Sequence, residues 1–337
     1  GKLQQSMGKG LDLDQARRLI ASVDAYGMRS TVSLITGFPD ETEADLRDTA
    51  DMFLYASQFG GTDVQMHLLN ALAGTPLTTR HRHALQLNLD EDAWSGDPQD
   101  REWIRDYPNL FVNFYTLPAL VPRVLLRGFQ ALLRCGRLRF NWLLQSLHRE
   151  SGHIYEVFLR FYEPCAQRNS IWYRSEHFTK AFLAFARELS AREGYGASLV
   201  LAAFYESWSE SVISRSDLAH ADQPLPVLPA QTALVRTTGD VLGIMEAIRE
   251  NRSLTDASTG QPGWVVVRAG VESTGEIQQI SELAGTVLQW CDGRATALEI
   301  GQRAKQLGFA PAALPDQAVA DILLGRLEAE GLICYSS

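Results

Sequence analysis

The spacing of apolar and polar positions along the first 80 residues predicts helices and buried strands in alternation. Apolar residues at helical spacing begin after Asp12 and end near Gly27, which predicts a capped helix. Residues 31–35 are β-branched and apolar, as in a buried parallel strand, and Thr42 can cap a second helix. Residues 62–69 predict the next strand. Such alternation is typical of βα units around a parallel sheet.

The first strand runs into the turn SLITGFPDE, residues 33–41, where Gly37 and Pro39 end it sharply. Ligands of parallel sheets bind at the carboxyl ends of the strands. Gly37 and Asn70 fall at two such ends, so we expect a ligand site there.

A helical region follows. Residues 107–149 contain six arginines and no acidic residue, interleaved with aromatic residues. A membrane-surface helix, a groove for an acidic ligand, and a helix pair with its arginines outside all fit this pattern. Further helices are expected at 154–162, 178–189 and 197–208, with Pro164 interrupting the first of them.

The last third of the chain begins with three prolines in residues 223–229, which predict a stiff extended linker. Strands are then expected at 233–237, 264–269 and 276–280. Residues 241–248 are ambiguous, although their apolar spacing suits a helix. Three helices complete the pattern, and they are expected at 282–291, from Thr296 to about Gly308, and at 316–330.

Composition narrows the class of protein. A chain of 337 residues can bury two cores, and its formal net charge of -9 argues against a broad nucleic-acid surface. No apolar run approaches the roughly 20 residues of a membrane span. Four scattered cysteines favour a reducing compartment, so we expect a cytoplasmic protein. No histidine has metal-ligand spacing with a cysteine or acid, and we predict no metal ligands in this chain.

The SLITGFPDE turn resembles the fifth strand of a radical S-adenosylmethionine (radical SAM) barrel, which carries the pattern Gly-x-Ile-x-Gly-x-x-Glu. The matching positions are Ser33, Ile35, Gly37 and Asp40, of which Ser33 and Asp40 depart from the family. The segments SMGKG (6–10) and HLLNALAGTPL (67–77) are also similar to the family's flanking turns. The resemblance implies an S-adenosylmethionine site whose cofactor-binding residues in this chain are Ser6, Ser33, Ile35, Gly37 and Asn70.

The same family holds a [4Fe-4S] cluster on a Cys-x-x-x-Cys-x-x-Cys loop, because cluster irons bind thiolates. This chain has only Cys135, Cys165, Cys291 and Cys334, at wide spacing. The resemblance therefore implies cluster ligands outside this chain, which we expect to be the C-terminal portion of a longer protein, with or without a cobalamin domain. A cluster-free relative is the alternative. Cys165 is either a hydrogen-atom donor to a substrate radical or a small buried apolar residue.

The tail sequences SELAGTVLQWCDGRATALEI (281–300) and DILLGRLEAEGLI (321–333) resemble the PqqD-like domain, which has a winged-helix fold and binds leader peptides of ribosomally made natural products. The resemblance implies that a leader adds as a strand at the sheet edge, flanked by residues 276–281 and the 316–330 helix. A winged-helix DNA binder and a domain that only packs structurally are the alternatives. Residues 229–337 carry eight basic and thirteen acidic residues, which speaks against phosphate binding.

The sequence thus predicts an α/β protein in three parts: a partial parallel βα barrel (1–82), a helical region (83–222) and a small α+β, winged-helix-like (PqqD-like) domain (223–337). The favoured function is the C-terminal portion of a radical SAM enzyme that modifies a ribosomally synthesised peptide. The alternatives are a radical SAM enzyme, cobalamin-dependent or not, that acts on a small molecule or lipid, and a non-catalytic peptide chaperone.

Overall fold

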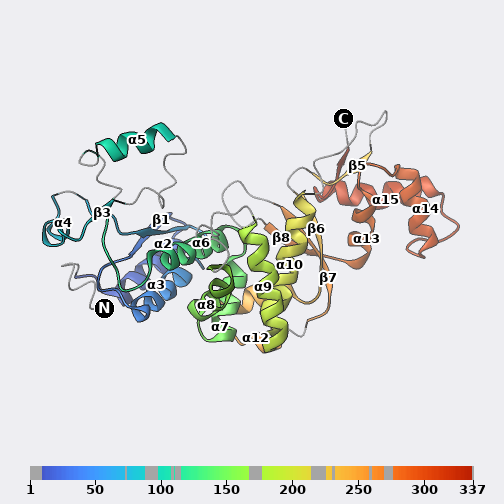
Figure 1. Ribbon diagram of the computed structural model, residues 1–337. Helices are drawn as coiled ribbons and strands as arrows, with labels where there is room; N and C mark the ends of the chain where they lie inside the picture. The colour runs from blue at the N-terminus through green and yellow to red at the C-terminus, as the bar shows by residue number, and fades with distance from the viewer. Residues whose placement is uncertain are drawn as a thin grey trace. The chain divides into compact units, whose positions relative to one another are not determined.

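The protein is a mixed α/β molecule that divides into two compact units (Figure 1). The computed structural model describes residues 10–72, 74–87, 98–107, 110, 115–166, 177–213, 225–229, 232–257, 260–268 and 276–335. Unit 1 comprises Gly1–Arg137 and Ser151–Phe178, and unit 2 comprises Leu138–Glu150 and Thr179–Ser337. No helix in the described parts of the chain has the length and apolar content that crossing a bilayer requires.

Unit 1 begins with the predicted order of helix, strand, helix and strand. These elements are α2 (Leu13–Ala25), β1 (Ser30–Thr36), α3 (Glu43–Ala56) and β2 (Thr62–Leu68). The two strands pair in parallel, with Ser30 opposite Thr62 and Thr36 opposite Leu68. The described part of this sheet has two strands and forms no closed barrel.

The helix α6 (Arg123–Arg139) lies along β2. Gln130 Nε2 donates to the Met66 carbonyl at 2.6 Å, and Arg137 Nη2 donates to the Thr62 carbonyl at 2.9 Å. Arg137 also forms an ion pair with Asp63, so at least one arginine of the basic segment has a structural contact. The remaining described elements of unit 1 are α4 (Pro76–Arg80), β3 (Gln86–Leu87), α5 (Pro98–Asp106), β4 (Tyr115–Thr116) and α8 (Ile154–Ala166).

The expected interruption at Pro164 is wrong, because α8 continues through it to Ala166. Proline removes one backbone donor and crowds the carbonyl four residues earlier. Pro164 lies in the last turn of the helix, where only two helical residues follow it. The cost is therefore confined to a single turn.

Unit 2 contains α7 (Asn141–Ser151), α9 (Phe178–Glu193) and α10 (Gly196–Ile213). Aromatic side chains form its helical core: Phe140 stacks on Phe182 with ring centroids 5.4 Å apart, and Phe204 meets Tyr205 at 5.0 Å. Glu150 accepts hydrogen bonds from the backbone of Ala197 and Ser198, which caps the start of α10.

The tail of unit 2 is a three-stranded antiparallel sheet in the order β6 (Thr232–Thr237), β7 (Gly263–Arg268), β8 (Glu276–Ile280). Between β6 and β7 lie α11 (Val241–Arg249) and α12 (Leu254–Ala257). The ambiguous 241–248 segment is thus helical, and Asp240 caps it by accepting from the Gly243 amide. The predicted strands are present at the predicted places.

Three helices, α13 (Glu282–Trp290), α14 (Ala297–Gln306) and α15 (Asp316–Ala329), cover one face of this sheet. Their core includes Val266, Leu288, Ile300 and Leu324, all at most 1% exposed. The opposite face is also buried at β6 and β7, where β6 contacts α10; its buried residues are Ala233, Val235, Val265 and Val267. The sheet therefore has a helical layer on each side.

The proline-rich segment is not simply a linker. Residues Pro226–Val227 form the short strand β5, which pairs antiparallel with β9 (Cys334–Tyr335) near the end of the chain. Leu225 and Val227 are buried. Proline is tolerated there because β5 pairs with β9 over two residues only, and Pro226 takes part through its carbonyl, which accepts from the Gly293 amide at 3.3 Å.

Candidate functional site

The turn after β1 is built around a buried carboxylate. Glu41 is 1% exposed and accepts hydrogen bonds from Thr36 Oγ1 at 2.7 Å and from the Gly37 amide. Burial raises the pKa of Glu41, and the hydrogen bonds from Thr36 and Gly37 oppose that rise. The acid that supports the turn is therefore Glu41, whereas the resemblance aligned its neighbour Asp40 with the acidic position.

Four of the residues predicted to bind the cofactor lie on or directly after the two strands of this small sheet. Ser33 and Ile35 lie on the exposed face of β1, and Ile35 is 42% exposed. Gly37 follows β1, and exposed Asn70 follows β2, where the Leu69 amide donates to the Thr36 carbonyl at 2.7 Å. Ser6 lies outside the described residues.

Gly37 has a φ of +93°, which favours glycine. A Cβ atom at this position would lie 3.6 Å from both Leu126 Cδ1 and the Leu69 amide nitrogen. A side chain there would thus point onto protein atoms, and a substitution would act mainly through the backbone conformation.

Sequence reasoning missed a line of polar side chains on the exposed face of β2. Gln65 Nε2 donates to Asp63 Oδ2 at 2.7 Å, and Gln65 Oε1 lies 3.2 Å from His67 Nε2. Asp63 is in turn held by Arg137 at 3.0 Å. The parallel register sets Gln65 opposite Ser33 and His67 opposite Ile35. The period-two pattern of residues 62–68 is the signal that could have grouped them, because alternate residues share a face.

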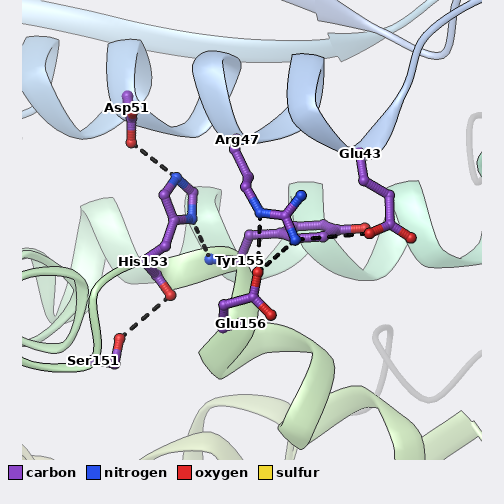
Figure 2. Close-up of polar contacts among 7 residues, drawn as sticks. All are labelled: Glu43, Arg47, Asp51, Ser151, His153, Tyr155 and Glu156. Atoms are coloured by element: carbon purple, nitrogen blue, oxygen red, sulfur yellow. Dashed lines mark hydrogen bonds and ion pairs between the residues drawn. The ribbon is translucent and has the colours of Figure 1, made fainter.

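The helix that follows the turn, α3, contacts α8 through an ion pair of Arg47 and through a histidine–carboxylate contact (Figure 2). Arg47 contacts Glu156 at 2.5 Å and Glu43 at 3.8 Å, and its guanidinium lies 5.0 Å from the centre of the Tyr155 ring. Burial, as the largest cause, raises the pKa of Tyr155 to about 12. These contacts fix the start of α3, and with it the turn.

The second contact of this pair of helices is between Asp51 Oδ1 and His153 Nε2, 2.9 Å apart (Figure 2). His153 Nδ1 accepts from the Tyr155 amide at 3.0 Å, which assigns the ring proton to Nε2. The pair of Asp51 and His153 offers ligand atoms of the kind that hold a metal ion. Its geometry suits the N-terminus of α8, where His153 satisfies an unpaired backbone donor.

The cysteines do not fit an iron-sulfur cluster. Cys135 and Cys165 belong to unit 1, and Cys291 and Cys334 to unit 2, so each unit holds fewer than the three thiolates of the family motif. Cys165 lies in the last turn of α8 and is partly buried. Burial raises the pKa of Cys291 to about 12, which makes it an inert core thiol.

A groove of about 380 Å³ lies in unit 2 between β8 and α15. Its floor is apolar, and its rim carries polar and charged side chains. The residues that line it come from β8 and its end (Gln278, Gln279, Ile280 and Ser281), from α13 (Leu283, Ala284 and Val287) and from α15 and its cap (Ile322, Leu323, Arg326, Leu327 and Glu330). These are the two segments that the sequence predicted to flank a peptide groove.

The edge of the sheet is open at this groove. β8 is the last strand in the order β6-β7-β8, and no described strand pairs with its outer edge. Arg268 at the end of β7 contacts Glu276 at 3.5 Å and donates to the Glu330 carbonyl at 3.0 Å. Through Arg268, the start of β8 thus lies near the end of α15.

The helix α13 packs closely against the sheet at Trp264. Its indole Nε1 donates to Glu282 at 3.0 Å, and Arg236 lies 5.3 Å from its ring centre. A Cβ atom on Gly285 would lie 2.1 Å from Trp264 Cγ, so only glycine permits this approach. These contacts of Trp264 position α13, which forms one wall of the groove.

Comparisons with known proteins add no assignment. No family model matches the chain, and the search of curated proteins finds none with significant similarity.

Proposed function

We propose that the groove between β8 and α15 binds an extended peptide, and that the chain is the C-terminal portion of a radical SAM enzyme that modifies this peptide. The observation that carries the proposal is a strand edge with no partner among the described strands, beside a groove with an apolar floor. An extended peptide that pairs with β8 satisfies the open backbone groups, and its alternate side chains enter the groove.

The small sheet of unit 1 supports the cofactor part of the proposal. Ile35 offers an apolar surface, and Ser33 and Asn70 offer polar groups beside it, which suits a flat base with hydrogen-bonding edges. S-adenosylmethionine would supply the radical chemistry. The cysteines of this chain do not fit the cluster that this chemistry needs, so we derive no radical step from its residues.

The same misfit favours a second candidate function, a non-catalytic peptide chaperone. Peptide binding at β8 requires no cluster, and a chaperone could keep the βα units as a scaffold. The two functions are separated by the parent reading frame: a Cys-x-x-x-Cys-x-x-Cys loop encoded upstream of Gly1 supports the enzyme, and an upstream region without it leaves the chaperone.

Replacing Ile322 with aspartate is expected to weaken peptide binding to the full chain by about 10- to 100-fold. Ile322 is 62% exposed at the rim of the groove, so the variant folds, yet burying a charge there opposes docking. The range corresponds to the roughly 1.5–3 kcal/mol gained when an isoleucine side chain is buried. Leader peptides translated from short reading frames beside the gene would be titrated by fluorescence anisotropy.

Leu298→Asp is the matched control, because Leu298 is an exposed leucine on α14 that does not line the groove. Its affinity for the same peptides should equal that of the unchanged protein. Equal losses in both variants, or no binding of any flanking peptide, would remove the peptide-binding proposal. The full chain is required, since the sheet also packs on α10.

A further inference from the structure

The rim of the groove has an ordered chemistry along α15. Ile322, Arg326 and Glu330 follow one another at four-residue spacing, and all three line the groove and are exposed. Residues four apart lie on one face of a helix. The inner stripe of the same helix, Leu323 and Leu327, forms the floor. The rim therefore presents an apolar, a basic and an acidic side chain in sequence.

The two charged side chains of the rim, those of Arg326 and Glu330, belong to the lining of the groove. Arg326 and Glu330 are correctly spaced to pair with each other, yet neither side chain has an ion pair or hydrogen bond among the described residues. Glu330 contributes only its backbone carbonyl, to Arg268. The side chain of Gln278 across the groove also has no described partner. Polar groups that a bound peptide would cover must then be satisfied by the peptide.

The spacing of this rim matches an extended strand. Four helical residues advance about 6 Å along the axis, and two strand residues advance about 6.6–6.8 Å. Side chains two apart on a strand share a face. A strand lying along α15 can thus set one side chain against each of Ile322, Arg326 and Glu330 in turn.

We propose that the groove selects peptides with the alternating pattern apolar-x-acidic-x-basic, read by Ile322, Arg326 and Glu330. This inference rests on the proposed peptide binding and names its specificity. In the proposed arrangement β8 and α15 run in opposite directions, because Arg268 contacts both the start of β8 and the end of α15. A peptide antiparallel to β8 then follows the direction of α15 and presents the pattern from its N-terminus. Antiparallel pairing continues the existing sheet and is the commoner arrangement.

The test uses the full chain and capped, fluorescently labelled seven-residue peptides. The matching peptide is Thr-Leu-Thr-Glu-Thr-Lys-Thr, the swapped peptide exchanges its Glu and Lys, and a third peptide has Thr at both charged positions. The matching peptide is expected to bind about tenfold more tightly than the swapped one at low salt, and the difference should shrink as salt rises. The reversed sequence, Thr-Lys-Thr-Glu-Thr-Leu-Thr, tests the strand direction and should bind more weakly.

Charge reversal in the protein completes the test. The double variant Arg326→Glu with Glu330→Arg should prefer the swapped peptide by a similar factor, because both partners have exchanged sign. Glu328→Arg, on the same helix but outside the groove, should leave the preference unchanged. Circular dichroism checks that the variants fold. We expect them to fold, because all three substituted side chains are exposed.

The outcomes separate the inference from the proposed function. Binding of all peptides with equal affinity, lost in Ile322→Asp, would overturn the charge pattern and leave strand addition in place. A preference that the double variant does not invert would also overturn it. Binding of none of these peptides and none of the flanking leaders would remove the proposed function itself.

Discussion

Replacing Gly285 with alanine is expected to destabilise unit 2 by about 3 kcal/mol, at the upper end of overpacking in a core. The added Cβ would lie 2.1 Å from Trp264 Cγ and 2.7 Å from Trp264 Cβ, atoms close to the backbone of a buried strand. A change of the Trp264 rotamer is opposed by the hydrogen bond from its indole to Glu282 and by the guanidinium of Arg236 over its ring. Either α13 or β7 must therefore move.

The measurement is urea unfolding followed by circular dichroism, with Gly325→Ala as the control. Gly325 lies within α15, and a Cβ atom there would meet nothing within 4 Å. Alanine should raise the free energy of unfolding by about 0.5–1 kcal/mol, because it restricts the unfolded chain and favours the helix. If Gly285→Ala were as stable as the unchanged protein, the close packing of α13 on Trp264 would be wrong.

Replacing Glu41 with alanine should cost unit 1 about 2–6 kcal/mol. The change leaves two buried donors, the Gly37 amide and the Thr36 hydroxyl, without their acceptor, at roughly 1–3 kcal/mol each. Hydrogen exchange of the β1 and α3 amides would measure the loss of local stability. Glu43 is an exposed residue in the first turn of α3, and Glu43→Ala should lower the free energy of unfolding by less than 1 kcal/mol. Similar effects of the two substitutions would contradict the role of Glu41 beneath the turn.

The pH dependence of Glu41 has a definite sign. Its folded pKa is raised, so between the unfolded and folded pKa values the folded state binds more protons. Stability from this group is therefore present at low pH and is lost as the pH rises through the folded pKa. Glutamine does not titrate, so Glu41→Gln lacks this contribution. The free energy of unfolding of the unchanged protein minus that of Glu41→Gln should therefore fall as the pH rises. A difference that stayed constant or grew would show that burial does not raise this pKa.

Local patterns predicted most of the elements because each carries its own signal. The β-branched run before Gly37, the capping residue Thr42 and the capping box at Thr296 all coincide with observed element ends. The groove-forming segments, 276–281 and 316–330, were predicted from a resemblance, and they lie on either side of the observed groove. What binds there is still a prediction.

Contacts between distant residues explain the parts that the sequence did not reveal. Pairing of β5 with β9 joins residues more than 100 positions apart, and the proline-rich composition of β5 conceals it. Glu41 reads as a surface acid next to Asp40, and only the folded turn shows that it is buried. Asp63, Gln65 and His67 form their hydrogen-bonded line on the exposed face of the two-stranded sheet. The sequence of one strand does not show which of its two faces is exposed.

Hydrogen exchange along β8 tests the central claim of peptide binding most directly. In the free chain the N–H groups of β8 that point away from β7 have no described strand partner and should exchange fast. With a saturating leader or matching peptide, exchange of these amides within residues 276–280 should slow strongly, while β1 and β2 stay unchanged. A bound peptide that leaves the outer edge of β8 exchanging at its free rate would contradict strand addition at this groove.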